Sequence, residues 1–379
     1  MTILRGKFQL FSCRSGKAYA QKLGNQLQLI IEKRHEELST KKTLSSREQT
    51  ELDFVQSIQE EDVRVGKANI LEFGDGEMDV ILDNSENVRD KDVFLVSCPY
   101  NTTDDHSINT NIMETLIFID TLHRAKARSV SLISLYYPYS RGDKQHAKDG
   151  IPAKLLANMY KTSGLNNLIT MDLHADQIMG FFDSQFIRIE NMHASSLMIH
   201  FLKDRLGDEA RIAAPDTGAA KRTQYVAKHL NKRMIMAYKR RSYEKTHTID
   251  EMKILGLPGE EEVVILDDMV ASGGSVIKMI DILKEKGVPK ITVAVAHPML
   301  IKDAVKHFDE AYEDKSNPFD LLIGTDSIPH NQEILDKPWY KEINTSRFIA
   351  KTIYEIHTSG SVTQLHKPDC VNDLDLWID

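Results

Sequence analysis

Aspartates end several of the apolar runs in this chain, and their position suggests the chemistry they could do. Asp172 ends the run NLITMD, Asp216 ends RIAAPD, Asp267 and Asp268 end VVILDD, and a further aspartate follows LLIGT. A single Asp after a strand is most often a helix cap or a turn former. Four such sites in one chain, one of them followed by His174, favour a rim of carboxylates suited to a hard divalent cation such as magnesium.

The most informative segment is VVILDDMVASGGSVIKMIDILKEKG, where a short Ser/Gly loop separates an apolar strand from an amphipathic helix. Gly273 and Gly274 allow backbone amides to point into the loop, and the helix expected from about Val276 adds partial positive charge. The pattern predicts a phosphate site, with Asp267 and Asp268 placed to bind the hydroxyls of a sugar. It is not a Walker A loop, because GxxxxGK[ST] is absent. The alternative is an ordinary strand-to-helix turn.

Two basic clusters also follow predicted strands. Arg141, Lys144 and Lys148 lie in YYPYSRGDKQHAKDG, and residues 239–241 are Lys-Arg-Arg. Arginine offers bidentate donors to phosphate, so the first cluster could clamp a polyphosphate. The polar stretch 242–252 has no core pattern and is typical of a mobile lid with cationic roots. Solvated charged loops are the alternative, and nucleic-acid binding is a weaker one because aromatic residues are few.

The segment LEFGDGEMDV predicts a tight turn between two strands. Phe73 lies there beside Asp75 and Glu77. Its GDG is too weak a match for a dinucleotide-binding fingerprint, because no helix pattern follows it.

The strands and helices that must position these residues follow the pattern of an α/β fold. Apolar runs such as VFLVS, SVSLISLYY and KITVAVAH alternate with helical stretches, which predicts parallel sheets covered on both faces. The runs are too many for one small sheet, so we expect two α/β domains with a boundary near 185–190. The charged stretch 28–66 lacks strand patterns, and Ser45 with Glu48 predicts a helix-capping box inside it. A solvated helical insertion is the plain interpretation of this stretch, and an interaction arm is the sharper one.

Length and composition set the class of protein. The chain has 379 residues with 48 Lys+Arg and 56 Asp+Glu, a net charge of −8, which argues against a general nucleic-acid coat. No apolar run approaches the ~18 residues of a membrane-spanning helix, and the N-terminus lacks a signal-peptide pattern. Three scattered cysteines give neither a disulfide framework nor a zinc spacing. We therefore expect a multi-domain cytoplasmic enzyme that binds neither membrane nor nucleic acid.

Several motifs together resemble the ribose-phosphate pyrophosphokinase (PRPP synthetase) family. They are LFSCRSGKAYA, FGDGEMDVILDNSENVRDKDVFLV, MDLHADQIMGFF, APDTGAAKR, YKRR, LDDMVASGGS, VAHPML and TDSIP. The resemblance implies two similar parallel-sheet domains of type I phosphoribosyltransferase-like fold. They would span 1–187, with the helical insertion at 28–66, and 188–365, followed by an acidic tail at 366–379.

The resemblance implies an ATP-dependent transferase of nucleotide biosynthesis. The β,γ-diphosphoryl group of ATP would pass to the C1 hydroxyl of ribose 5-phosphate, giving PRPP and AMP, with Mg²⁺ as cofactor. A homo-oligomer, either dimer or hexamer, would share each adenosine site between subunits.

The resemblance also implies roles for particular residues. The implied ATP-binding residues are Phe73, Asp75, Gly76, Glu77, Arg141 and Gly142. The implied ribose 5-phosphate residues are Asp267, Asp268, Ala271, Ser272, Gly273, Gly274 and Ser275. The implied metal-linked residues are Asp172, His174 and Asp216, and the implied catalytic residues are Lys239 and Arg241.

The chain departs from the family pattern at several positions. Ala271 stands where the sugar-phosphate loop usually has an aspartate, Gly142 where glutamine is common, and Lys144 where arginine is common. A catalytically weak homologue acting as a partner subunit is therefore one alternative. A type I phosphoribosyltransferase is another, although it would need neither the MDLH motif nor the adenosine segment.

Overall fold

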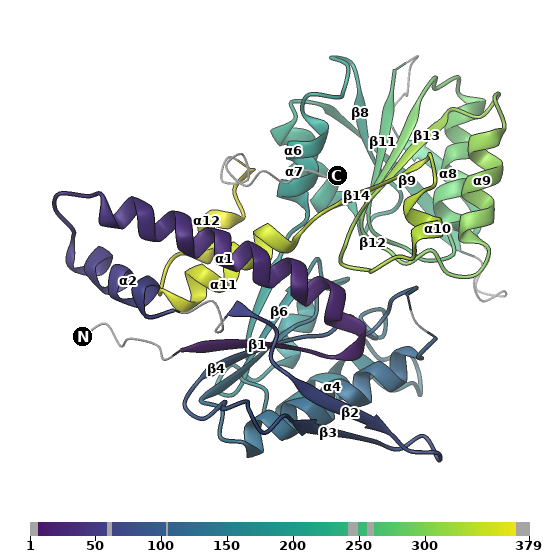
Figure 1. Cartoon of the computed structure of the whole chain (residues 1–379). Coiled ribbons are helices and arrows are strands. Elements are labelled where there is room, and N and C mark those ends of the chain that lie inside the picture. The colour runs from purple at the N-terminus through teal and green to yellow at the C-terminus, as the bar shows by residue number, and fades with distance from the viewer. Residues whose placement is uncertain (1–6, 59–62, 104, 242–248, 256–260, 369–379) are drawn as a thin grey trace. The chain divides into compact units, whose positions relative to one another are not determined.

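The computed structural model describes residues 7–58, 63–103, 105–241, 249–255 and 261–368, which fold into two compact units (Figure 1). The first unit runs to Met192 and takes in Thr345–Leu365, and the second comprises His193–Asn344 and the residues from His366. The domains expected from sequence divide at 187/188 and keep 188–365 together. In the structure the helix Ser346–His357 instead packs within the first unit. Of the expected tail, residues 369–379 lie outside the described part.

The first unit is built on a parallel sheet in the order β1-β4-β5-β6-β7. Its strands are β1 (Phe8–Ser12), β4 (Asp92–Val96), β5 (Ser129–Ile133), β6 (Asn167–Met171) and β7 (Arg188–Met192). The strands are nearly continuous apolar runs because helices cover both faces of the sheet. Figure 1 shows α4 on one face and α1 with α11 on the other.

The helices of this unit start where local sequence signals place them. Ser107 caps α4 by accepting a hydrogen bond from the Thr110 amide at 3.1 Å, and Pro152 begins α5, which Gly164 ends in a left-handed conformation. The helical elements are η1 (Arg14–Gly16), α1 (Lys17–Ser39), α2 (Ser46–Ser57), α4 (Ile108–Arg124), α5 (Pro152–Ser163), η2 (Asp176–Phe181), α11 (Ser346–His357) and α12 (Val362–Leu365). A separate hairpin pairs β2 (Ala68–Glu72) with β3 (Met78–Leu82).

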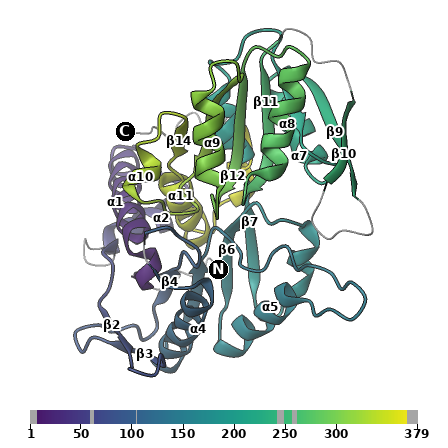
Figure 2. The same ribbon diagram turned by 90° about the vertical axis from the view of Figure 1, so that its right-hand side faces the viewer.

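The second unit carries a sheet in the order β10-β9-β8-β11-β12-β13-β14, parallel except for the edge strand β10. Its strands are β8 (Arg211–Ala214), β9 (Arg233–Arg241), β10 (Ile249–Leu255), β11 (Val263–Val270), β12 (Ile291–Pro298), β13 (Phe319–Thr325) and β14 (Tyr340–Ile343). Its helices are α6 (Ser195–Leu202), α7 (Ala220–His229), α8 (Gly274–Glu285), α9 (Ala304–Glu313) and α10 (Gln332–Leu335). Helices α8 and α9 lie over one face of this sheet (Figure 2). The expectation of parallel-sheet α/β units is confirmed.

The helical insertion is confirmed, and its helices are tied to α11. Helix α1 already begins at Lys17, so the stretch predicted to start at 28 begins inside a continuous helix. The predicted capping box is present: Ser45 Oγ accepts from the Glu48 amide at 3.3 Å, and Glu48 Oε2 accepts from the Ser45 amide at 2.9 Å. Helix α2 buries Phe54, whose ring lies 4.7 Å from that of His357 on α11. The insertion is therefore part of the core of this unit.

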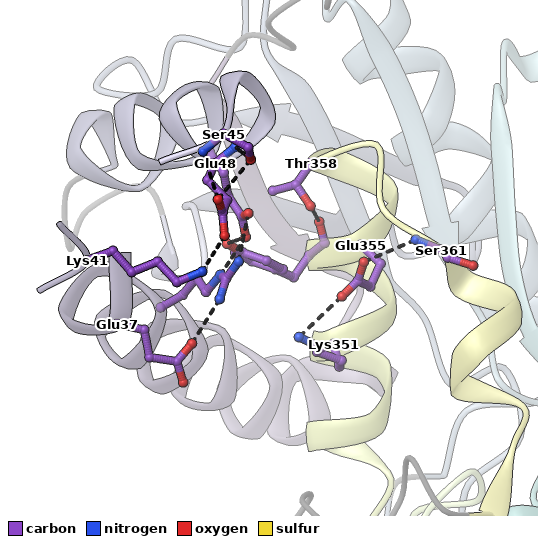
Figure 3. Close-up of polar contacts among 11 residues, drawn as sticks. Glu37, Lys41, Ser45, Glu48, Lys351, Glu355, Thr358 and Ser361 are labelled. Atoms are coloured by element: carbon purple, nitrogen blue, oxygen red, sulfur yellow. Dashed lines mark hydrogen bonds and ion pairs between the residues drawn. The ribbon is translucent and has the colours of Figure 1, made fainter. Parts of the chain in front are cut away.

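Ion pairs and a hydrogen bond join α1, α2 and α11 around an open charged pocket (Figure 3). Arg34 of α1 forms two hydrogen bonds with Glu51 of α2, at 2.8 and 3.0 Å, and the hydroxyl of Tyr354 of α11 donates to the same carboxylate at 2.6 Å. Lys351 and Glu355 pair along α11 at 3.2 Å. The acidic and basic side chains around this pocket pair with one another. We therefore infer that these contacts hold the three helices together, and we call them the helix brace.

Replacing Glu51 should show how much the helix brace contributes to the free energy of unfolding. Glu51→Gln removes the carboxylate that receives two hydrogen bonds from the partly buried guanidinium of Arg34 and leaves only the exposed pair with Glu37, so we expect a loss of about 1–3 kcal/mol in the free energy of unfolding. Thermal unfolding followed by circular dichroism measures it. Glu32→Gln, at an exposed glutamate of α1 that accepts only a surface hydrogen bond from Gln28, is the matched control and should change stability by under ~0.5 kcal/mol. Equal effects of the two variants would contradict the helix brace.

Candidate functional site

Three carboxylates meet at one edge of the second sheet. Strands β8 and β11 are parallel neighbours with Ala213 opposite Ile265, so their carboxyl ends open on the same side. Asp216 follows β8, and Asp267 and Asp268 lie in β11, with Asp268 two residues before the end of the strand at Val270. Asp268 is buried and Asp267 is partly exposed.

Electrostatic repulsion acts among these carboxylates. Burial and then the charge of Asp268, with a smaller contribution from Asp216, raise the pKa of Asp267 well above its usual range. The Asp268 amide opposes the shift by donating to Asp267 Oδ1 at 2.9 Å. Asp216 Oδ1 accepts from the amides of Gly218 and Ala219 at 2.9 and 3.2 Å, which fixes it at the start of α7. The structure thus groups aspartates that the sequence predicted separately, and the group favours a cation or hydroxyl donors.

The loop after β11 presents a bare helix start beside these acids. Gly273 is the N-cap of α8 with φ +77°, a conformation that favours glycine, and its position supplies no side-chain cap. The amides of the first helical turn have no acceptor within the helix. A Cβ on Gly274 would meet nothing within 4 Å, so space lies open at this point. Backbone bonds from Leu300 to Val270 and from Ile301 to Ala271, at 3.2 and 3.0 Å, hold the base of the loop. This geometry can bind a phosphate.

Lys239 and Arg241 lie at the end of β9, next to the antiparallel strand β10. Lys239 is opposite Met252 and Arg241 is opposite Ile249 in the register. Of the expected lid 242–252, residues 242–248 lie outside the described part, and the remainder belongs to β10.

In the first unit, the turn between β2 and β3 carries the expected adenosine residues at an exposed tip. The Phe73 amide donates to the Glu77 carbonyl at 2.8 Å, and the Gly76 amide donates to the Phe73 carbonyl at 2.9 Å. Asp75 Oδ1 accepts from the Glu77 amide at 3.0 Å, and Gly76 has φ +89°. The Phe73 side chain is 51% exposed, an unusual position for an aromatic ring without a partner surface.

Gly142 has a steric reason to be glycine in this chain. A Cβ there would lie 2.4 Å from Cγ of Pro152, the residue that begins α5. Its amide donates to the Tyr139 carbonyl at 2.8 Å and its carbonyl accepts from the Ala153 amide at 3.2 Å. The glutamine common at this position in the resembled family would not fit here, whereas the adjacent Arg141 is exposed.

Asp172 and His174 follow β6 but differ in access. Asp172 is buried with φ +40°, and its amide donates to the Met192 carbonyl at 2.8 Å. His174 is exposed and is therefore the more accessible of the two. In the part of the chain that the structure describes, no group of three His, Cys, Asp or Glu side chains could by itself hold a metal. A magnesium ion would therefore take further ligands from substrate and water, as is usual for this ion.

Sequence reasoning missed one polar cluster in the first unit. Arg14 contacts Glu114 and Glu72, which lie 100 and 58 positions away along the chain. Partners so far apart leave no local spacing pattern, and the cluster becomes visible only through their contacts with Arg14 in the folded unit.

Comparisons with known proteins agree over most of the chain. The model for the N-terminal domain of ribose phosphate pyrophosphokinase matches residues 8–164, and that for the phosphoribosyl synthetase-associated domain matches residues 209–367. Ribose-phosphate pyrophosphokinase from Burkholderia pseudomallei is 34% identical over 305 residues, covering 80% of this chain and 90% of the relative. The protein of the same name from Campylobacter jejuni is 34% identical over 299 residues, covering 79% and 90%.

A solved structure shares the fold. Phosphoribosylpyrophosphate synthetase from Mycobacterium smegmatis superposes with a TM-score of 0.75 at 24% identity, covering 94% of this chain and 100% of that one. Among the described residues, no helix has the length and apolar character needed to cross a membrane.

Burial of Asp267 and its repulsion by Asp268 predict that Asp267→Asn stabilises the ligand-free protein. A raised folded-state pKa means that ionised Asp267 is destabilising above the unfolded pKa of about 3.9, and increasingly so as pH rises through the folded value. The variant should therefore melt higher at pH 7, by about 2–4 °C for each kcal/mol of repulsion relieved, and the gain should vanish near pH 4. Asp281→Asn, at an exposed carboxylate of α8, is the control and should show no such pH-dependent gain. A pH-independent effect at Asp267 would contradict the electrostatic explanation.

Proposed function

This chain belongs to the ribose-phosphate pyrophosphokinase family, and from that premise we propose that it transfers the β,γ-diphosphoryl group of ATP to the C1 hydroxyl of ribose 5-phosphate. The products are PRPP and AMP, for use in nucleotide biosynthesis. The observation that supports the proposal for this chain is that Asp267 and Asp268 lie in β11 and the uncapped start of α8 follows after one short loop.

Ribose 5-phosphate would bind along that segment. Its phosphate accepts hydrogen bonds from the backbone amides of the loop Ser272–Ser275, where Gly273 and Gly274 leave room for close approach. The ribose hydroxyls donate to Asp267 and Asp268, which partly relieves the repulsion between these carboxylates. Ala271 contributes backbone only, so any contact made by an aspartate at this position in relatives is absent.

The residues proposed to bind ATP lie in the first unit. Phe73, Asp75, Gly76 and Glu77 form the adenosine segment, and Arg141 with Gly142 binds the phosphates. Exposure of Phe73 and Arg141 supports these roles.

The transfer is an in-line displacement that requires positioning and charge neutralisation. The C1 oxygen attacks the β-phosphorus, the bond from that phosphorus to the α-phosphate oxygen breaks, and the hydroxyl proton is released. AMP leaves with the electron pair of the broken bond. Lys239 and Arg241 stabilise the negative charge that grows on the leaving and transferring groups.

Magnesium fits the donor chemistry of these residues. Asp216 offers carboxylate oxygen and lies within electrostatic range of Asp267, while His174 is exposed and Asp172 is buried beside it. Asp216 in the second unit and His174 and Asp172 in the first would each be candidates to hold Mg²⁺, which would supply positive charge at phosphate oxygens when bound.

A second copy of the chain is the expected partner. The adenosine segment would reach a neighbouring subunit of a homo-oligomer, dimer or hexamer, and the exposed side chains of Leu71, Phe73 and Ile81 on the hairpin support this role. A cytoplasmic location remains a prediction from the sequence.

Incubating the purified chain with ATP, Mg²⁺ and ribose 5-phosphate tests the proposal. We expect AMP and PRPP in equal amounts, measured by ³¹P NMR or chromatography. Absence of both products contradicts it. Activity only after addition of a separate synthetase would favour the alternative of a weak partner subunit, for which Ala271 is the motivating residue. Ribosylation of a nucleobase would favour a phosphoribosyltransferase.

Lys239→Ala tests the assignment of catalytic charge. Because that charge is needed mainly in the transition state, we expect kcat to fall by about 10²–10³ while the Kd of ribose 5-phosphate changes little. Lys228→Ala, at an exposed lysine of α7, is the matched control and should leave both values near wild type. An equal loss in kcat and in sugar binding at Lys239 would count against the assignment.

A further inference from the structure

Arg14 lies between the core of the first unit and the hairpin that carries Phe73. It begins η1 and is separated from the end of β1 by Cys13 alone. Its backbone amide and its Nε donate to the two oxygens of Glu114, both at 2.7 Å. Its Nη1 donates to Glu72 Oε2 at 2.9 Å, and its Nη2 lies 3.9 Å from the sulfur of Met78.

The Glu114 end of this cluster is rigid. The Glu114 side chain is fully buried on α4, in contrast to Glu72, whose side chain is 41% exposed. The neighbouring Cys13 is also buried, with Sγ 3.6 Å from the hydroxyl of Thr115 on the same helix. A buried carboxylate that receives both a backbone and a guanidinium donor fixes the position of the arginine.

The other end of the cluster holds the base of the turn. Glu72 and Met78 are paired in the hairpin register, and Arg14 contacts both. They are the last pair before the turn, and Glu72 directly precedes Phe73. His106 Nε2 lies 3.4 Å from the same Glu72 oxygen. The planar guanidinium can direct separate donors to Glu114 and Glu72, a geometry that lysine cannot reproduce with a single ammonium.

We propose that Arg14 is a positioning residue for ATP: by tying the Glu72–Met78 pair to buried Glu114, it fixes the direction of the turn 73–77 and so sets the affinity of the enzyme for the nucleotide. This inference rests on the proposed role of Phe73, Asp75 and Glu77 in binding adenosine. Small displacements of binding groups change affinity strongly. Loss of the Arg14 contacts should therefore produce a measurable change in the Kd of ATP.

The test measures binding and turnover separately in the full-length chain. Isothermal titration gives the Kd of ATP and of ribose 5-phosphate, and steady-state kinetics give KM for each. For Arg14→Met we expect a rise of about tenfold in the Kd and KM of ATP, with values for ribose 5-phosphate within twofold of wild type. For Arg14→Lys we expect a Kd of ATP between those of wild type and Arg14→Met, because lysine restores the positive charge but not the two separate guanidinium donors.

Two further variants control for damage to the fold. Glu72→Gln leaves the Arg14–Glu114 pair intact and should reproduce part of the loss in ATP binding. Arg124→Met removes an arginine from an exposed pair with Asp120 on the same helix α4 and should leave ATP binding unchanged. If Arg14→Met folds poorly, Glu72→Gln decides the question.

Unchanged ATP binding in Arg14→Met or, where that variant folds poorly, in Glu72→Gln overturns the proposal. An equal loss of ATP and ribose 5-phosphate binding also overturns it, because that result indicates general damage. Failure of the wild-type chain to form PRPP refutes the proposed function instead, and the Kd of ATP still decides the role of Arg14.

Discussion

The adjacency of β8 and β11 is the constraint on which the rest of the second unit depends. Parallel pairing with Ala213 opposite Ile265 forces the ends of both strands to one edge, and so brings Asp216 within electrostatic range of Asp267. Grouped carboxylates cost stability in the absence of a cation or hydroxyl donors. The bare start of α8 beside them offers the opposite polarity, and together they suit a phosphorylated sugar.

In the first unit, long-range polar contacts connect the core with the exposed turn that carries Phe73. Arg14 connects buried Glu114 with the base of the β2–β3 turn, while Arg34 and Glu51 tie the inserted helices to α11. The net charge of −8 is therefore an average over different surroundings: Asp216, Asp267 and Asp268 lie at one edge of the second sheet, whereas Arg14 lies at the base of the β2–β3 turn.

Sequence patterns predicted what depends on local spacing. Apolar runs predicted the strands, the Ser45–Glu48 spacing predicted a capping box that the structure contains, and Gly273 and Gly274 indicated the unusual start of α8. Features that depend on distant residues were not predictable. The pKa shift of Asp267 involves Asp216 in the loop after β8, the close contact with Pro152 explains the glycine at 142, and α11 returns to pack with the inserted helices of the first unit.

Binding of ribose 5-phosphate by the β11–α8 segment is tested most directly by NMR on the chain labelled at glycine and aspartate. Titration with ribose 5-phosphate should shift the amide signals of Gly273 and Gly274 and the carboxylate signals of Asp267 and Asp268 together, with one saturation curve. The exposed Asp281 should remain unchanged. Saturable binding that leaves the four signals in place, or shifts signals only in the other unit, would contradict binding at this segment.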